Sequence, residues 1–326
     1  MTGGNVIVTI LLILGMLVIY EKFSRHSSRL SESKFYKQYL VTHDDLSGID
    51  VNKPMLWIHV THDQNARWWR SFYSRNSSFL NQPYQFLTMN SVINKNKNDF
   101  NVAVIDDDAF ASLLPGWSHD LSAMADPIRS HIRQVALTKV LAQYGGMLVP
   151  SSFACSKPLI EFYRIALGNK DMFVCENQTR SVISSTNVFY PDIGFMGCVP
   201  KSPSMMKLND FVVRNASRSY TDEPEFSGEI SGFCASMAKV GESSIVDGQY
   251  VGIKKADSSP VSLEDLFGTD NVKLHNACFG IWLPQRKILD RLKYGYFVRM
   301  SSEQIMKSNE FICRAIQASG AHMRAN

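Results

Sequence analysis

Residues 144–159 read YGGMLVPSSFACSKPL. Two glycines follow a run with helical spacing, and the apolar residues Met147–Val149 follow the glycines. A helix that turns sharply into a strand usually needs a residue with positive φ, which glycine adopts at little cost. We therefore predict that Tyr144, Gly145 and Gly146 form a structural turn between a helix and a short strand.

The run before this turn, Asp126–Tyr144, is the clearest helix in the chain. Asp126 suits the N-cap, Pro127 the first turn and Gly145 the end of the helix. Apolar residues recur along it at spacings of three and four, which predicts one buried face. They are Ile128, Ile132, Val135, Ala136, Val140 and Leu141.

Short apolar segments on both sides of this helix predict strands. The segment Pro54–Val60 is apolar along most of its length, which is typical of a strand buried on both faces. Residues 65–76 have helical periodicity, and residues 91–99 are polar and predict a loop. The other strand segments are Tyr84–Asn90, Phe100–Asp108, 145–153, Asp171–Asn177, Ile193–Val199 and Ala277–Leu283. Alternating strands and helices predict an α/β class with a mostly parallel sheet flanked by helices. Residues 217–274 carry no clear pattern.

The N-terminus predicts a membrane anchor. Residues 1–20 carry no charge and would span about 30 Å as a helix, the thickness of a hydrocarbon core. A cleaved signal peptide is the alternative, but no basic residue precedes the apolar run Val6–Tyr20. We predict an uncleaved transmembrane anchor at residues 1–20, a polar stem at 21–52 and a globular domain at 53–326.

Two features disagree on which side of the membrane the domain lies. The basic residues after the anchor favour the cytoplasmic side; they are Lys22, Arg25, Arg29 and Lys34. Three Asn-x-Ser/Thr sequons, at Asn76, Asn177 and Asn215, would suit a lumenal domain. We give the charge asymmetry more weight and expect a single-pass protein with a cytoplasmic domain.

Composition excludes several classes of protein. The 326 residues have a formal net charge of +4 without a basic block, so we expect no nucleic-acid partner. The six cysteines show no C-x-x-C spacing, which argues against a zinc site and favours buried thiols over bridges.

Taken together, the segments PMLWIHV, VAVIDDDAF, IRQVALTKVLAQYGG and IGFMGCVPKSP resemble a family. It is the group of GT-A glycosyltransferases that carry an Asp-x-Asp sugar-binding region, such as a yeast initiating mannosyltransferase and many capsule transferases. The resemblance covers Pro54–Pro203, and its specific part is the unit from Tyr144 to Leu159. It implies a GT-A-like, Rossmann-like fold.

The departures from this family fall on its chemistry. The resemblance implies aspartates at Pro150 and Ser152, on either side of Ser151, to hold the Mg²⁺ or Mn²⁺ that offsets the charge of a leaving diphosphate. Proline offers no side-chain ligand and serine only a neutral hydroxyl. The aspartate and arginine usual in the preceding helix correspond to Gln134 and Leu137. We interpret residues 150–152 as a degenerate metal site.

Other residues are candidates for the missing charges. The run Asp106, Asp107, Asp108 ends a predicted strand and could bind a cation, or could form a solvated turn and helix cap. Basic side chains could hold a nucleotide sugar without metal, or lie on a solvated surface; they are Arg129, Arg133 and Lys157. His59, His62 and Asp63 could form a site but are more typical of a polar strand end. Trp68 and Trp69 could form a base-stacking platform but are more typical of a core.

Two functional hypotheses follow. The first is a membrane-anchored, catalytically inactive glycosyltransferase-like protein, attached through residues 6–20, which needs no cofactor and serves as a scaffold for protein partners in a larger assembly. The second is an active hexosyltransferase with a nucleotide-sugar donor. It would be metal-independent, or would use Asp106–Asp108 with Mn²⁺ or Mg²⁺.

Overall fold

A computed structural model describes residues 50–61, 82–178, 188–218 and 223–320, all of which belong to one compact unit, Val41–Asn326. The predicted anchor at residues 1–20 and most of the stem lie outside these ranges, as do His62, Asp63, Trp68 and Trp69. Among the described residues, no helix has both the length and the apolar character needed to cross a bilayer.

The centre of the described unit is a six-stranded sheet with strand order β2-β1-β3-β6-β5-β7. Its strands are β1 (Met55–His59), β2 (Asn101–Ile105), β3 (Gly146–Leu148), β5 (Met172–Gln178), β6 (Phe189–Cys198) and β7 (Ser244–Val246). The pairs β1/β2, β1/β3 and β5/β7 are parallel, whereas β6 is antiparallel to both of its neighbours. The prediction of an α/β class with a mostly parallel sheet is therefore confirmed. A second sheet pairs β4 (Phe153–Cys155) with β8 (Gly280–Trp282).

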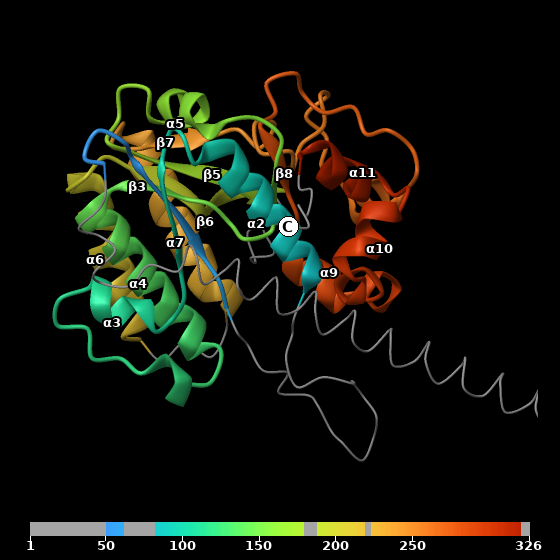
Figure 1. Ribbon diagram of the computed structural model, residues 1–326. Coiled ribbons are helices and arrows are strands. Elements are labelled where there is room, and N and C mark those ends of the chain that lie inside the picture. The colour runs from blue at the N-terminus through green and yellow to red at the C-terminus, as the bar shows by residue number, and fades with distance from the viewer. Residues whose placement is uncertain (1–49, 62–81, 179–187, 219–222, 321–326) are drawn as a thin grey trace, which may run out of the picture. The chain divides into compact units, whose positions relative to one another are not determined.

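Helices cover both faces of the sheet (Figure 1). One face packs against α3 (Ala109–Leu113), α4 (Ile128–Tyr144), α6 (Pro203–Ala216) and α7 (Glu223–Lys239). On the other face, α5 (Leu159–Leu167) directs Phe162 against Phe173 and Phe195. Neighbouring residues of a strand point to opposite faces of the sheet. Trp57 and Ile58 of β1 are both buried, so β1 is covered on both faces. This explains why the β1 segment is continuously apolar.

The helix α2 (Pro83–Asn96) corrects one sequence prediction, since Tyr84–Asn90 was expected as a strand and residues 91–99 as a loop. It packs against β4, α5 and the C-terminal helices. Residues all round it are therefore buried, including the polar Thr88 and Ser91. Burial on every side removes the helical period, and a short apolar run then cannot be told from a strand.

The start of α4 also differs from the prediction. The helix begins at Ile128, with Pro127 at the N-cap and no side-chain cap. The Asp126 carboxylate instead accepts a hydrogen bond from the Ser130 hydroxyl at 2.8 Å. Ile128 is exposed, whereas four members of the predicted stripe are buried: Val135, Ala136, Val140 and Leu141.

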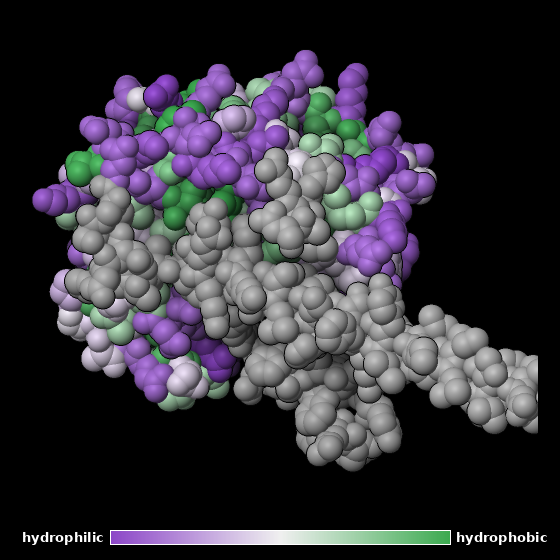
Figure 2. Space-filling model, in the orientation of Figure 1, coloured by the Kyte–Doolittle hydropathy of each residue, from purple (hydrophilic) through white to green (hydrophobic). Residues whose placement is uncertain are grey.

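The C-terminal part packs around α2 and β4. It comprises α8 (Leu263–Phe267), α9 (Gln285–Asp290), two short 3₁₀ helices, η5 (Leu292–Tyr294) and η6 (Phe297–Arg299), then α10 (Ser302–Lys307) and α11 (Phe311–Ala318). A further 3₁₀ turn, η3 (Leu121–Ala123), precedes α4. On the face seen in Figure 2, hydrophilic residues cover most of the described surface, with apolar ones scattered among them.

All six cysteines are buried thiols. Burial raises the pKa of both Cys155 and Cys234 to about 12, so these thiols stay protonated at neutral pH. The sequon residue Asn215 is buried as well, and its amide donates to the Phe226 carbonyl at 3.4 Å. The folded chain therefore does not present Asn215 for glycosylation.

Candidate functional site

The segment after β3 is a closed turn. The Phe153 N–H donates to the Pro150 carbonyl at 3.0 Å and so closes the turn around Ser151 and Ser152. The Ser152 side chain is buried, and its hydroxyl donates to the Leu283 carbonyl at 3.0 Å. In return the Leu283 N–H donates to the Ser152 carbonyl at 3.2 Å. The chain after β8 therefore holds Ser152 by two hydrogen bonds.

The same turn is also held from α2. The Thr88 hydroxyl donates to the Ser151 carbonyl, so the turn is fastened on two sides. Within the turn from Pro150 to Phe153, Pro150 and Ser151 are partly exposed and the other two residues are buried. The residues present do not fit a divalent cation, because Pro150 has no ligand atom and the neutral Ser152 hydroxyl already bonds inside the protein. Within the described ranges, no three His, Cys, Asp or Glu side chains group together as a metal site would require.

The turn before β3 is built from tight backbone contacts. Gly145 has φ +68° and Gly146 φ +92°, both in the left-handed region that favours glycine. The Gly145 carbonyl accepts from the Trp57 indole N–H at 2.9 Å. The Tyr144 hydroxyl donates to the Leu113 carbonyl at 2.7 Å. These three residues therefore join α4 and α3 to the sheet, and the two glycines are buried.

The run Asp106–Asp108 lies where β2 ends, and its three carboxylates have different surroundings. Asp106 accepts the Ala109 N–H at 3.0 Å and so caps the start of α3. Asp108 is exposed. Asp107 is held by two partners from other elements, described next. The three carboxylates thus do not converge on one point.

Asp107 joins β1, β2 and α4 in an ion-pair network. Arg133 Nη2 donates to Asp107 Oδ2 at 2.7 Å and its Nε to Oδ1 at 2.8 Å, a bidentate arrangement. His59 Nε2 lies 3.0 Å from Asp107 Oδ1, and the His59 ring stacks on Phe110. Burial would raise the pKa of Asp107, but the hydrogen bonds and charges of His59 and Arg133 outweigh it and lower that pKa to about 2. Arg133 therefore meets a carboxylate that stays ionised at every physiological pH.

The other two predicted cations lie elsewhere. Arg129 Nε donates to the Met124 carbonyl at 2.8 Å, just before α4. Lys157 Nζ donates to the Asn276 carbonyl at 2.6 Å and lies 5.7 Å from the centre of the Phe279 ring. Arg129, Arg133 and Lys157 are thus bound to three different parts of the chain.

A second network was not predicted from the sequence. The buried Lys254 ammonium contacts Glu176 at the end of β5 and Asp247 Oδ2 at 3.1 Å, and lies 4.5 Å over the Phe189 ring. Burial favours the neutral amine, but Glu176 and Asp247 outweigh it, so the pKa of Lys254 is raised. Lys254 therefore stays charged and links β5 to the chain after β7. The only sequence signal was a lysine in a segment without a clear pattern.

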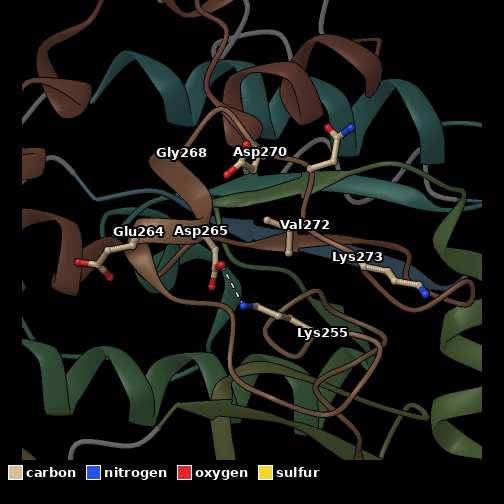
Figure 3. Close-up of a pocket in the computed structure, with 8 residues that line it drawn as sticks. Lys255, Glu264, Asp265, Gly268, Asp270, Val272 and Lys273 are labelled. Carbon is tan, nitrogen blue, oxygen red and sulfur yellow. Dashed lines mark hydrogen bonds and ion pairs between the residues drawn. The ribbon is translucent and has the colours of Figure 1, made fainter.

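A pocket of about 170 Å³ is lined by none of the residues described above (Figure 3). It is lined by Lys255, Glu264, Asp265, Gly268, Asp270, Asn271, Val272 and Lys273. Lys255 Nζ forms an ion pair with Asp265 Oδ1 at 2.9 Å across it, drawn as a dashed line in Figure 3. None of the site residues predicted from the sequence lines this pocket.

No family model and no curated protein matches the chain. Among solved structures, it is similar to the PaToxG glycosyltransferase, with 11% identity and a TM-score of 0.37 over 90% of this chain and 97% of that one. It is also similar to the apo-form glycosyltransferase GlyE of Streptococcus pneumoniae TIGR4, with 10% identity and a TM-score of 0.34. That match covers 61% of this chain and 46% of the GlyE chain, so the chain spans less than half of GlyE.

Proposed function

We propose that this chain is a membrane-anchored protein with a glycosyltransferase-like fold that does not transfer sugar by the metal route. The observation that carries the proposal is the closed turn at residues 150–152. Its buried Ser152 hydroxyl bonds to Leu283, and its Pro150 has no ligand atom. A metal that clamps a diphosphate would need carboxylate oxygens at this strand end.

The residues that could replace the missing metal ligands have surroundings that support the same proposal. Asp107 and Arg133 form a bidentate pair, so the charge that each could offer to a metal or a diphosphate is largely offset by the other. Asp106 caps a helix. A donor bound here would have to break contacts that fasten β1, β2 and α4 together.

The proposed role is structural. The residues that form the turn between α4 and β3 suit the fold, whereas the positions that would serve only a metal hold other residue types. A fold can persist without its chemistry when it still supports an assembly. We propose that the domain, tethered through residues 6–20, is a scaffolding component that binds protein partners at a membrane.

The test is calorimetric titration of the full-length protein with UDP-glucose and GDP-mannose, each with and without Mn²⁺. The proposal expects no saturable donor binding that depends on Mn²⁺. Saturable binding with added Mn²⁺ would overturn it in favour of the active-enzyme hypothesis. In that case Asp107→Asn and Asp108→Asn would locate the ligands, with Asp120→Asn as the matched control, because Asp120 caps η3 away from the strand ends.

The scaffolding role has its own test. Chemical cross-linking of the protein in its native membrane, followed by mass spectrometry, should recover the same protein neighbours in independent preparations. Recovery of the chain only as an isolated monomer would contradict this role and leave the absence of metal-dependent transfer unaffected.

A further inference from the structure

The segment Gln285–Met300 carries a net positive charge. It holds five basic residues (Arg286, Lys287, Arg291, Lys293 and Arg299) and one acidic residue, Asp290. Five minus one gives a formal charge of +4, equal to the net charge of all 326 residues. Residues 22–37 carry the same formal charge, so Gln285–Met300 is one of the basic segments of the chain, and it is one that the structure describes.

An apolar side chain lies at the centre of this segment. Leu292, the first residue of η5, is 99% exposed. Its two neighbours, Arg291 and Lys293, are exposed as well. Leu292 therefore presents its whole side chain to the surroundings with a cation on each side of it.

The backbone under Leu292 is firmly held. Tyr294 is buried, stacks on Phe267 with ring centroids 4.7 Å apart, and donates its hydroxyl to Glu264 Oε1 at 2.8 Å. Phe297 is fully buried between Phe267 and Tyr84, 5.0 Å from each ring. The turn is therefore a fixed projection from the aromatic cluster under η5 and η6, in which Tyr294 and Phe297 point inward while Leu292 is exposed.

Glu264 offsets the charge of Arg291 only weakly. Arg291 Nη1 lies 3.7 Å from Glu264 Oε1, but both side chains are more than half exposed, and such pairs are weak. Lys293 lies 5.2 Å over the Tyr294 ring. Tyr296, also partly exposed, adds an amphipathic aromatic side chain of the kind enriched at membrane interfaces.

We propose that Arg291, Leu292 and Lys293 form a contact with an anionic lipid bilayer. Leu292 would insert at the level of the headgroups, and the flanking cations would bind lipid phosphates and carboxylates. The exposed leucine favours a lipid surface over the phosphate backbone of a nucleic acid, which offers no hydrocarbon to it, and an acidic polypeptide is an outcome of the test below. The inference depends neither on the catalytic state of the fold nor on the predicted anchor.

The test is hydrogen–deuterium exchange of the full-length protein with two kinds of vesicle, pure phosphatidylcholine and phosphatidylcholine with 30% phosphatidylserine. Amides of residues 288–299 should exchange more slowly only with the anionic vesicles, and high salt should weaken the effect. Each cation near an anionic leaflet strengthens binding by about fivefold. Arg291→Gln combined with Lys293→Gln should therefore weaken the affinity of this segment for the anionic vesicles by about 25-fold, and the protection should fall accordingly.

Two matched variants separate lipid contact from a folding defect. Leu292→Asp should remove the protection, whereas Val240→Asp should leave it unchanged, because Val240 is also largely exposed but lies after α7. Exchange in the rest of the chain verifies the fold of each variant. Equal exchange with both kinds of vesicle would overturn the proposal. So would protection produced by duplex DNA or polyglutamate but not by anionic vesicles.

Discussion

A side chain at Gly146 should destabilise the fold strongly, through two separable effects. A Cβ built on Gly146 would lie 2.2 Å from the Met55 carbonyl oxygen and 2.8 Å from the Met55 Cβ. Met55 belongs to β1, a central strand paired with β3. The clash is therefore with backbone, and relief requires β1 and β3 to move apart.

The magnitude follows from the two effects. Positive φ at a residue other than glycine costs about 1–3 kcal/mol. Forcing extra volume into a packed core costs about 1–3 kcal/mol more. Gly146→Ala should thus lose about 2–6 kcal/mol, a large share of the 5–15 kcal/mol typical of total stability. Gly145→Ala should behave similarly, since its Cβ would lie 2.4 Å from the Pro200 nitrogen.

Two other glycines serve as controls. Gly116 has φ +74° with nothing within 4 Å of a built Cβ, so Gly116→Ala isolates the backbone strain. Gly232, inside α7, has neither positive φ nor a near neighbour, so Gly232→Ala should be neutral or stabilising by about 0.5–1 kcal/mol. The assay is urea unfolding followed by tryptophan fluorescence. If Gly146→Ala loses no more than Gly116→Ala, the close approach to Met55 has no energetic role and the reasoning is refuted.

Three further outcomes are expected. Because the folded-state pKa of Asp107 lies near 2, below its usual 3.8, the carboxylate stabilises the fold above about pH 4, and this contribution is lost as pH falls toward 2. Allowing for partial exposure, it amounts to about 1–2 kcal/mol, so the stability difference between the parent and Asp107→Asn should narrow over that range; a constant difference would contradict the pairing with Arg133. Ser152→Asp should lower the urea midpoint more than Ser151→Asp, because it buries a carboxylate facing a carbonyl oxygen; equal midpoints would show that position 152 is accessible. Intact-mass spectrometry should find the N-terminal segment retained, and a mature start beyond Glu21 would contradict the anchor prediction.

The sequence was informative where a local backbone requirement decides the structure. The helix ending at Tyr144 and the glycines that follow it could be read directly, because apolar spacing and positive φ are properties of adjacent residues. The prediction of a strand and a loop was wrong for α2, because burial on every side removes the hydrophobic period by which a helix is recognised.

The partners of the charged and polar side chains were decided only by the tertiary structure. Asp107 was a candidate metal ligand and Arg133 a candidate phosphate ligand, yet β2 and α4 bring them together across 26 positions. Ser152 meets Leu283 across 131 positions, which closes the turn that the resemblance placed at a metal site. The sequence shows that a run of aspartates or an arginine carries charge. Whether that charge is available to a ligand depends on strand order and helix packing, which set the neighbours of each side chain.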